Sequence, residues 1–195
     1  MPVETEIKFR VEDLAGLSRR LEAAGFRMLT PRSFESNVLY DTPERTMRAR
    51  TEILRIRNYD GRCVLTHKRL PDTGPGEDVH KHRIETETEV SNGEALVQVF
   101  VSLGLVAAFH YEKWRTEWED GRGHCVVDET PIGNFAELEG TAEWIDQAAE
   151  RLGIPRTGYI TLSYGRLFDL WREQQGSSAK DLTFAAVSGK STQPG

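Results

Sequence analysis

The first stretch of the chain, residues 3–9, places a charged residue at every second position from Glu4 to Lys8. A period of two is typical of a β-strand, whose successive side chains point to opposite faces. Glu4, Glu6 and Lys8 therefore share one face of the predicted strand, and the opposite face is mainly apolar. Taken alone, the segment fits the edge of a half-buried sheet with solvated carboxylates. That interpretation changes only if other strands carry the same charged face.

Later segments repeat the alternation. The dipeptides Asp60-Gly61 and Asp120-Gly121 are typical hairpin turns, and the predicted strands occupy residues 32–41, 52–59, 62–69, 79–90, 109–119, 122–129 and 134–140. Apolar residues at helical spacing predict helices over residues 13–24, 93–103, 142–152 and 162–174. Prolines and glycines predict a long loop at 70–78.

One face of each strand collects seven bases and seven acids. The bases are Lys8, Arg55, Arg57, Lys68, Arg83, Lys113 and Arg115, and the acids are Glu4, Glu6, Glu85, Glu87, Asp128, Glu137 and Glu139. Helices need an apolar surface to pack on, so we expect the apolar strand faces to turn outward beneath the helices. The charged faces would then enclose a hydrated lumen. The alternative is an open sheet with solvated cross-strand ion pairs, which are individually weak.

Three Glu-x-Glu pairs favour the lumen over the open sheet. They are Glu4 with Glu6, Glu85 with Glu87, and Glu137 with Glu139. Like charges on one strand face repel each other unless a cation binds between them, and buried charges are costly unless they pair or bind ions. The pattern therefore indicates a polyanion held by Lys and Arg, with metal cations held by the carboxylates.

Composition narrows the class of partner. The 195 residues are enough for one domain, which we place at residues 1–175, and we expect the Gly- and Ser-rich tail at 176–195 to be disordered. A net charge of -6 gives no general attraction for nucleic acid or for an anionic membrane. With two cysteines and no long apolar run, we expect a cytoplasmic protein with reduced thiols. The sequence leaves open whether the protein is a monomer or a homodimer. His80 and His82 alternate away from the charged face, so we expect them to be exposed to solvent rather than to bind metal.

The charged segments resemble the CYTH superfamily, also called triphosphate tunnel metalloenzymes, which includes thiamine triphosphatases, inorganic triphosphatases and class IV adenylate cyclases. Its N-terminal Glu-x-Glu-x-Lys signature matches residues 4–8. The other matching segments are Tyr40-Asp41-Thr42-Pro43, Leu54-Arg55-Ile56-Arg57, Thr66-His67-Lys68, Arg83-Ile84-Glu85-Thr86-Glu87, Lys113-Trp114-Arg115, Asp128 and Glu137-Leu138-Glu139-Gly140. The resemblance spans about residues 2–172, and it implies an eight-stranded antiparallel closed barrel with a tunnel through it and helices packed outside.

The resemblance also implies residue roles. The seven bases would contact the phosphates of a triphosphate substrate, with Lys8, Lys68 and Arg57 as catalytic residues. Mg2+ or Mn2+ would be held by Glu4, Glu6, Asp128, Glu137 and Glu139, with Glu85 and Glu87 as additional ligands. Several members carry a further lysine on the C-terminal helix that plugs one tunnel mouth. This chain has no lysine between Lys113 and Lys180, which leaves Arg166 or Arg172 as substitutes.

These expectations support three functions. The leading hypothesis is metal-dependent hydrolysis of inorganic triphosphate or of an organic triphosphate such as thiamine triphosphate. The second is a class IV adenylate cyclase, which forms cyclic AMP and pyrophosphate from ATP. The third is a noncatalytic module that binds polyphosphate or a nucleotide.

Overall fold

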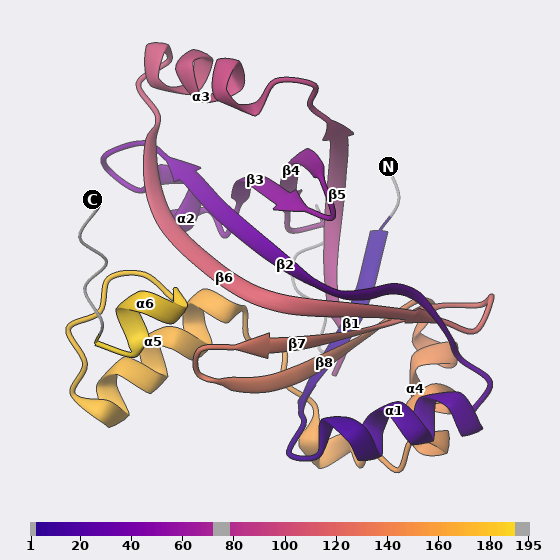
Figure 1. The fold of residues 1–195 in the computed structure, drawn as a ribbon. Coiled ribbons are helices and arrows are strands. Elements are labelled where there is room, and N and C mark those ends of the chain that lie inside the picture. Colours follow the sequence, from indigo (N-terminus) through magenta and orange to yellow (C-terminus); the bar gives the residue numbers. More distant parts are fainter. Residues whose placement is uncertain (1–2, 72–78, 190–195) are drawn as a thin grey trace.

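Eight antiparallel strands close into a barrel, which confirms the predicted fold class (Figure 1). The computed structural model describes residues 3–71 and 79–189, so most of the predicted loop at 70–78 lies outside the described residues. The strands are β1 (Val3–Arg10), β2 (Arg27–Asp41), β3 (Ile53–Tyr59), β4 (Arg62–Arg69), β5 (Lys81–Glu89), β6 (Val106–Glu119), β7 (His124–Thr130) and β8 (Gly133–Glu139). They follow the order β1-β5-β4-β3-β2-β6-β7-β8, and β8 pairs with β1 to close the sheet.

The longer helices begin at side-chain caps that the sequence supplies. The helices are α1 (Leu14–Ala23), α2 (Thr46–Ala49), α3 (Gly93–Ser102), α4 (Ala142–Arg151), α5 (Tyr164–Gln175) and α6 (Phe184–Val187), with a 3-10 turn η1 (Arg156–Gly158). Asp13, Asn92, Thr141 and Ser163 each accept a hydrogen bond from the backbone N–H three residues later. Within the described residues, no helix has the length and apolar character needed to cross a membrane.

Strands β2 and β6 are longer than predicted, beginning at residues 27 and 106 rather than 32 and 109. They pair over most of their length, from Arg27 opposite Glu119 to Asp41 opposite Val106. Pro31 has no N–H to donate to the ladder, and the pairing shifts register between Met28 and Thr30 and again across the proline, between Thr30 and Ser33. Pairing with β6 therefore extends β2 past a residue that, in the sequence alone, suggests a break.

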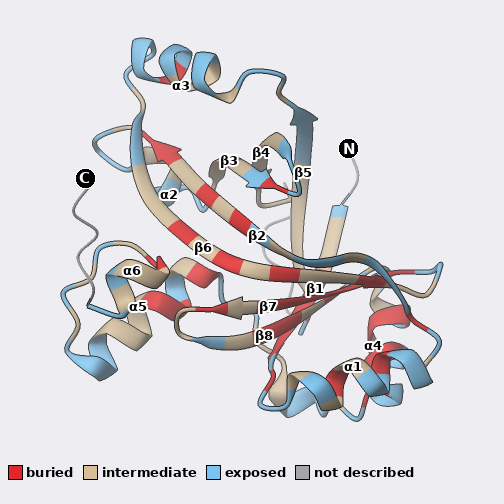
Figure 2. Ribbon diagram, in the orientation of Figure 1, coloured by how far each residue is buried: buried red, intermediate tan, exposed pale blue. Residues whose placement is uncertain are grey.

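Two apolar clusters cover the outside of the barrel. In the larger, α1 and α4 pack on β1, β7 and β8, with Ile7, Leu17, Leu138 and Ile145 fully buried. In the other, α3 packs through Phe100 onto the outer faces of β2, β3 and β4. Figure 2 shows buried positions on α1 and α4, the two helices of the larger cluster. The prediction that the apolar strand faces turn outward beneath helices is therefore confirmed.

A third apolar cluster lies on the inner strand faces, where α5 packs. Tyr111 and Phe135 precede Lys113 and Glu137 by two residues, so they share the inner faces of β6 and β8. The rings of Tyr111 and Phe135 lie 6.2 and 5.7 Å from the ring of Tyr164, the first residue of α5. Helix α5 thus fills one end of the lumen with apolar side chains, and the charged residues begin beyond it.

The residues after α5 correct the expectation of a disordered tail, as far as the structure describes them. Leu182 is fully buried, its N–H donates to the carbonyl of His110, and its carbonyl accepts from the N–H of Glu112. Strand β7 pairs with β6 only from Trp114 onward, so the preceding part of β6 offers backbone groups that the C-terminal segment takes up. Residues 190–195 lie outside the described residues.

Candidate active site in the barrel lumen

All seven bases and seven acids predicted for the lumen lie on the inner strand faces. Residues directly opposite each other in an antiparallel sheet share a face. The opposed pairs include Glu4 with Arg83, Glu6 with Glu139, Lys8 with Glu137, Lys68 with Glu85, and Arg115 with Asp128. The period of two therefore brings together charges from strands that are far apart in the sequence.

Six of these inner-face residues form a tightly paired group, here called the closed cluster. Its members are Lys8, Glu35, Lys113, Arg115, Asp128 and Glu137. Arg115 binds Asp128 through two hydrogen bonds of 2.7 and 2.8 Å, and its Nη2 lies 3.1 Å from Glu137 Oε2. Lys113 Nζ lies 2.9 Å from Asp128 and 3.2 Å from Glu35. Lys8 Nζ donates to Glu137 Oε1 at 2.5 Å. Each acid in this cluster is matched by at least one base.

Pairing overcomes the cost of burial in the closed cluster. Burial disfavours the charged form of Glu35, but Lys113 and Arg115 outweigh it and hold the pKa of this carboxyl well below its ordinary value. In the same way, Lys8 and Lys113 outweigh burial at Glu137 and hold its pKa low. Both acids therefore stay ionised at neutral pH, and they keep the bases fixed in the lumen.

A second group, here called the carboxylate cluster, consists of Glu4, Glu6, Glu85 and Glu139. Lys68 Nζ contacts Glu4 at 2.6 Å and Glu85 at 2.9 Å, and Lys81 pairs with Glu6. Burial, together with Glu4, raises the pKa of Glu85 to about 8 despite Lys68. Burial and the neighbouring Glu4 and Glu6 raise the pKa of Glu139 to about 7. Here negative charge exceeds the positive charge available to balance it.

Two arginines of β3 line another part of the lumen. Arg55 donates to Tyr111 and to Thr66, each at 3.1 Å, and both Arg55 and Arg57 lie within 3.4 Å of Glu87. The Nε atoms of both arginines are buried without a protein hydrogen-bond partner. Buried N–H groups of this kind are expected to bind an acceptor that the protein itself does not supply. Arg83, from β5, donates to the carbonyl of His82.

The carboxylate cluster fits a hard divalent cation by its donors, although its oxygens are not gathered in a ready-made cage. Among the described residues, no three His, Cys, Asp or Glu side chains converge closely enough to hold a metal. Glu4, Glu6 and Glu85 are turned toward Lys68 and Lys81 instead. Oxygen donors with excess negative charge are nevertheless what Mg2+ and Mn2+ prefer. Asp128 and Glu137, which the resemblance placed in the main set of metal ligands, are paired with bases of the closed cluster instead.

The sequence interpretation missed several lumen residues. Glu35 and Asn37 are fully buried on the inner face of β2, where Asn37 donates to Glu35 at 2.8 Å. Glu35 and Asn37 lie two residues apart, so a period of two places them on one face of the strand. The mixed composition of residues 32–41 made this alternation hard to recognise. The alternation places Lys81 on the same strand face as Arg83, although it was not counted among the seven bases, and in the structure it pairs with Glu6. Tyr164 gave no such signal, because it lies on a helix.

The expected replacements for a lysine on the plugging helix do not face the lumen charges. Arg166 and Arg172 both pair with Asp169 of α5 itself. The residue that α5 directs toward the lumen charges is Tyr164, whose hydroxyl donates to Asp128 Oδ2 at 2.7 Å.

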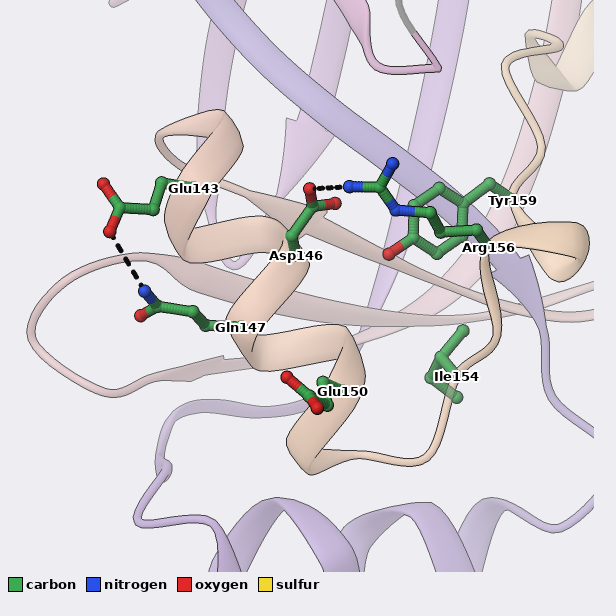
Figure 3. Close-up of a pocket in the computed structure, with 7 residues that line it drawn as sticks. All are labelled: Glu143, Asp146, Gln147, Glu150, Ile154, Arg156 and Tyr159. Carbon is green, nitrogen blue, oxygen red and sulfur yellow. Dashed lines mark hydrogen bonds and ion pairs between the residues drawn. The ribbon is translucent and has the colours of Figure 1, made fainter.

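One surface pocket lies outside the barrel. It has a volume of about 420 Å³ and is lined by residues of α4 together with Arg156 and Tyr159. In Figure 3, Asp146 points toward Arg156, whereas Glu143 is hydrogen-bonded to Gln147. Asp146 accepts a hydrogen bond from Arg156 and lies 3.1 Å from Nε2 of His80. The expectation that His80 is exposed is therefore wrong: this residue, which precedes β5, is buried, and Asp146 of α4 supplies a partner. No predicted site residue lines this pocket.

The fold and the lumen define a closed antiparallel tunnel barrel with a charged interior and a helix at one end. The chain belongs to the CYTH domain family, whose model matches residues 2–160. A relative from Methanocaldococcus jannaschii, named "Putative adenylate cyclase", is 28% identical over 147 residues, which cover 74% of this chain and 81% of the relative.

Solved structures share the fold. A Vibrio parahaemolyticus protein described as a "putative adenylate cyclase" superposes with a TM-score of 0.72 at 18% identity, covering 85% of this chain and 97% of the other. A Hippeastrum protein described as a "putative adenylyl cyclase" superposes with a TM-score of 0.59 at 20% identity, covering 86% and 96%. At these identities, the likeness concerns the fold alone.

Proposed function

We propose that this protein is a metal-dependent enzyme that hydrolyses a triphosphate, either inorganic triphosphate or an organic one such as thiamine triphosphate. The observation that carries this proposal is that one lumen holds fixed bases together with a carboxylate cluster that lacks enough positive charge. A linear polyanion would contact the bases, and a divalent cation would balance the acids. A site for a neutral ligand would need neither feature, and a site for a cationic ligand would not need the fixed bases.

The bases would bind the phosphate chain. Arg55 and Arg57 supply buried guanidinium N–H groups without protein partners, and Lys8, Lys113 and Arg115 supply charges held in place by acids. Lys68 and Arg83 would complete the set from β4 and β5. Once they contact the bound phosphates, donors held in place by the surrounding structure stabilise the negative charge that develops on the transferred phosphoryl group, without reorganising during the chemical step.

The carboxylate cluster would hold Mg2+ or Mn2+. Glu4, Glu6, Glu85 and Glu139 are the best candidates, because burial and the neighbouring acids raise the pKa values of Glu85 and Glu139, and a bound cation would favour their ionised form. A bound divalent cation would supply charge neutralisation at the phosphates and activation of the attacking water. Water would then attack the terminal phosphorus in line, the phosphoanhydride P–O bond would break, and no covalent enzyme intermediate would form.

A class IV adenylate cyclase is the second candidate, and the relatives' names favour it. In that reaction the ribose 3'-hydroxyl of ATP attacks the α-phosphorus, so that pyrophosphate leaves and cyclic AMP forms. The same bases and carboxylates would serve both reactions. The Hippeastrum protein, described as a "putative adenylyl cyclase", is also described as having a dominant triphosphatase activity, so such a name does not decide between them.

A substrate panel separates the candidates. The protein would be incubated with Mg2+ or Mn2+ and with tripolyphosphate, thiamine triphosphate or ATP, and the products would be resolved by ion chromatography. Orthophosphate as the main product supports the proposal. Cyclic AMP with pyrophosphate as the main products would favour the cyclase. Tight binding of tripolyphosphate without turnover under any metal would favour a noncatalytic binding module.

A further inference from the structure

Tyr164 is the residue at which the apolar end of the lumen meets the closed cluster. Its hydroxyl donates to Asp128 Oδ2 at 2.7 Å, while its ring packs against Tyr111 and Phe135. Lys8 Nζ and Lys113 Nζ lie 4.4 and 4.9 Å from the ring centroid, within the range of cation–π interactions. One side chain of α5 thus contacts three members of the closed cluster.

Asp128 accepts hydrogen bonds from four directions. Lys113 Nζ, Arg115 Nε and Arg115 Nη2 supply three of them, and the Tyr164 hydroxyl supplies the fourth. Tyr164 is the one neutral donor among these partners. A bound phosphate competes for the two bases, because phosphate oxygens and carboxylate oxygens accept the same hydrogen bonds. The Tyr164 hydroxyl is uncharged, so a bound phosphate does not attract it away from Asp128 as it attracts the two bases.

The position of Tyr164 is fixed by backbone contacts on both sides of α5. Before the helix, Ile160 exchanges two hydrogen bonds with Lys8, at 3.2 and 2.7 Å, along the part of β1 that β5 does not pair with. After the helix, Leu182 is hydrogen-bonded to β6 beside Tyr111. The C-terminal segment therefore fills two gaps in the barrel wall and holds the helix between them.

We propose that Tyr164 is a positioning residue, which keeps Asp128 hydrogen-bonded and in place when Lys113 and Arg115 turn toward bound phosphates. Without the hydroxyl, the departing bases would leave a buried carboxylate with too few donors, which is costly. That cost would oppose phosphate binding. This inference rests on the proposed function, because it assumes that the phosphates enter the lumen.

The chemistry of the side chain supports this role. Other aromatic residues of the same cluster, such as Phe135 and Phe168, are phenylalanines, so packing alone does not require a hydroxyl. Burial and Asp128 hold the pKa of Tyr164 well above its ordinary value, so the phenol remains a hydrogen-bond donor at any working pH.

The test compares Tyr164→Phe with Tyr159→Phe. The control variant also removes a tyrosine hydroxyl, but from the pocket of Figure 3, which lies outside the barrel. Binding of inorganic tripolyphosphate without divalent metal would be measured by titration calorimetry, and thermal unfolding would be recorded for each variant. We expect Tyr164→Phe to bind at least about tenfold more weakly than the wild type, and Tyr159→Phe to bind as the wild type does.

Each outcome decides the positioning role of Tyr164, the proposed function, or both. Equal affinity of Tyr164→Phe and the wild type would overturn the positioning role, as would a lowered melting temperature with unchanged affinity, which indicates a purely structural hydroxyl. Equal weakening in both variants would overturn it as well. If the wild type binds tripolyphosphate but hydrolyses no triphosphate, the proposed function fails while the role of Tyr164 is still decided by affinity. No binding by the wild type would overturn both.

Discussion

The closed cluster and the carboxylate cluster are built from the same residue types, but their charge balance is opposite. In the closed cluster, Asp128 is contacted by Lys113 and Arg115, and its neighbours Glu35 and Glu137 have pKa values well below the ordinary value. In the carboxylate cluster, four acids share Lys68, Lys81 and Arg83. Lys81 outweighs burial and lowers the pKa of Glu6, but the pKa values of Glu85 and Glu139 are raised. In the closed cluster the protein's own bases balance the acids, whereas in the carboxylate cluster the acids outnumber the bases.

This difference gives the two clusters opposite pH dependences. A lowered carboxyl pKa stabilises the folded state above the ordinary value of 4.5, and that stabilisation is lost as the pH falls below it. A raised carboxyl pKa has the reverse effect. The folded state then binds more protons than the unfolded state, and the free energy of unfolding falls as the pH rises from about 4.5 toward 7 or 8. The closed cluster would thus order the lumen, and the carboxylate cluster would gain stability from a cation.

The largest effect is expected from neutralising the buried acid of the closed cluster. Asp128 is fully buried, and Asp128→Asn leaves Lys113 and Arg115 with only Glu35 and Glu137 as counter-charges. Removing one partner of a buried ion pair typically costs about 3–5 kcal/mol. Urea unfolding at neutral pH without divalent metal measures the loss.

Glu139→Gln is the matched variant in the carboxylate cluster. It removes a charge that its neighbours disfavour, so the free energy of unfolding should stay unchanged or rise at about pH 8 without metal. If the two amide variants destabilise the protein equally, the proposed difference between the clusters is wrong.

The next effect concerns catalysis. Arg57→Ala removes a guanidinium group whose buried Nε has no protein partner, so we expect kcat/KM for the preferred triphosphate to fall by about 10²–10³, or about 2.7–4 kcal/mol. Arg62→Ala is the control, because Arg62 is an exposed arginine of the same hairpin, 3.9 Å from Glu89. A loss of less than about threefold for Arg57→Ala, or an equal loss in both variants, would remove Arg57 from the site.

The strand faces were predictable because their period of two is independent of the rest of the fold. Once the outer faces are apolar, every charged residue at alternating positions must face the lumen, and this places all fourteen predicted charges there. Glu35 was missed because Phe34 and the neighbouring serines hide the alternation in β2. A stricter use of the same rule would have found it.

Other features depend on tertiary structure that local patterns do not encode. Tyr164 meets Asp128, 36 residues away, only because α5 enters the lumen end. Leu182 is buried because β7 is shorter than β6, so part of β6 has backbone groups that β7 does not pair with and that the segment around Leu182 takes up. The lengths of these two strands, and not the sequence of residues 176–189, determine this contact. His80 is buried because α4 brings Asp146 next to it. Roles for the carboxylates as metal ligands remain predictions.

A divalent cation should reverse the pH dependence that the carboxylate cluster imposes. Without metal, the melting temperature is expected to fall between about pH 5 and 8 as Glu139 and Glu85 lose protons. With Mn2+ it should rise over the same range, because the metal binds the deprotonated acids, and saturation at about 100 times Kd adds about 2.7 kcal/mol. Thermal unfolding at matched ionic strength, with and without Mn2+, measures both trends.

Glu139→Gln again supplies the control for this measurement. It should flatten the decline without metal and weaken the stabilisation by Mn2+, whereas Arg62→Ala should leave both unchanged. Stabilisation by Mn2+ that is the same at both ends of the pH range, or that survives in Glu139→Gln, would place the cation elsewhere.

The smallest effect is expected one residue away from the largest. Glu129 follows Asp128 in β7, so it points to the outer face, where it binds Arg32 through hydrogen bonds of 2.6 and 3.1 Å. The geometry resembles that of Asp128 with Arg115, but Arg32 remains about half exposed, at 49%. Solvent screens such a pair, so Glu129→Gln should cost less than about 1 kcal/mol in the urea unfolding that tests Asp128→Asn. Both substitutions remove one charge from the same strand and from an ion pair of similar geometry. The ratio of the two losses in unfolding free energy therefore reports the effect of burial. Comparable losses at 128 and 129 would mean that β7 is sensitive to any substitution, and that the lumen has no special dependence on its buried charge.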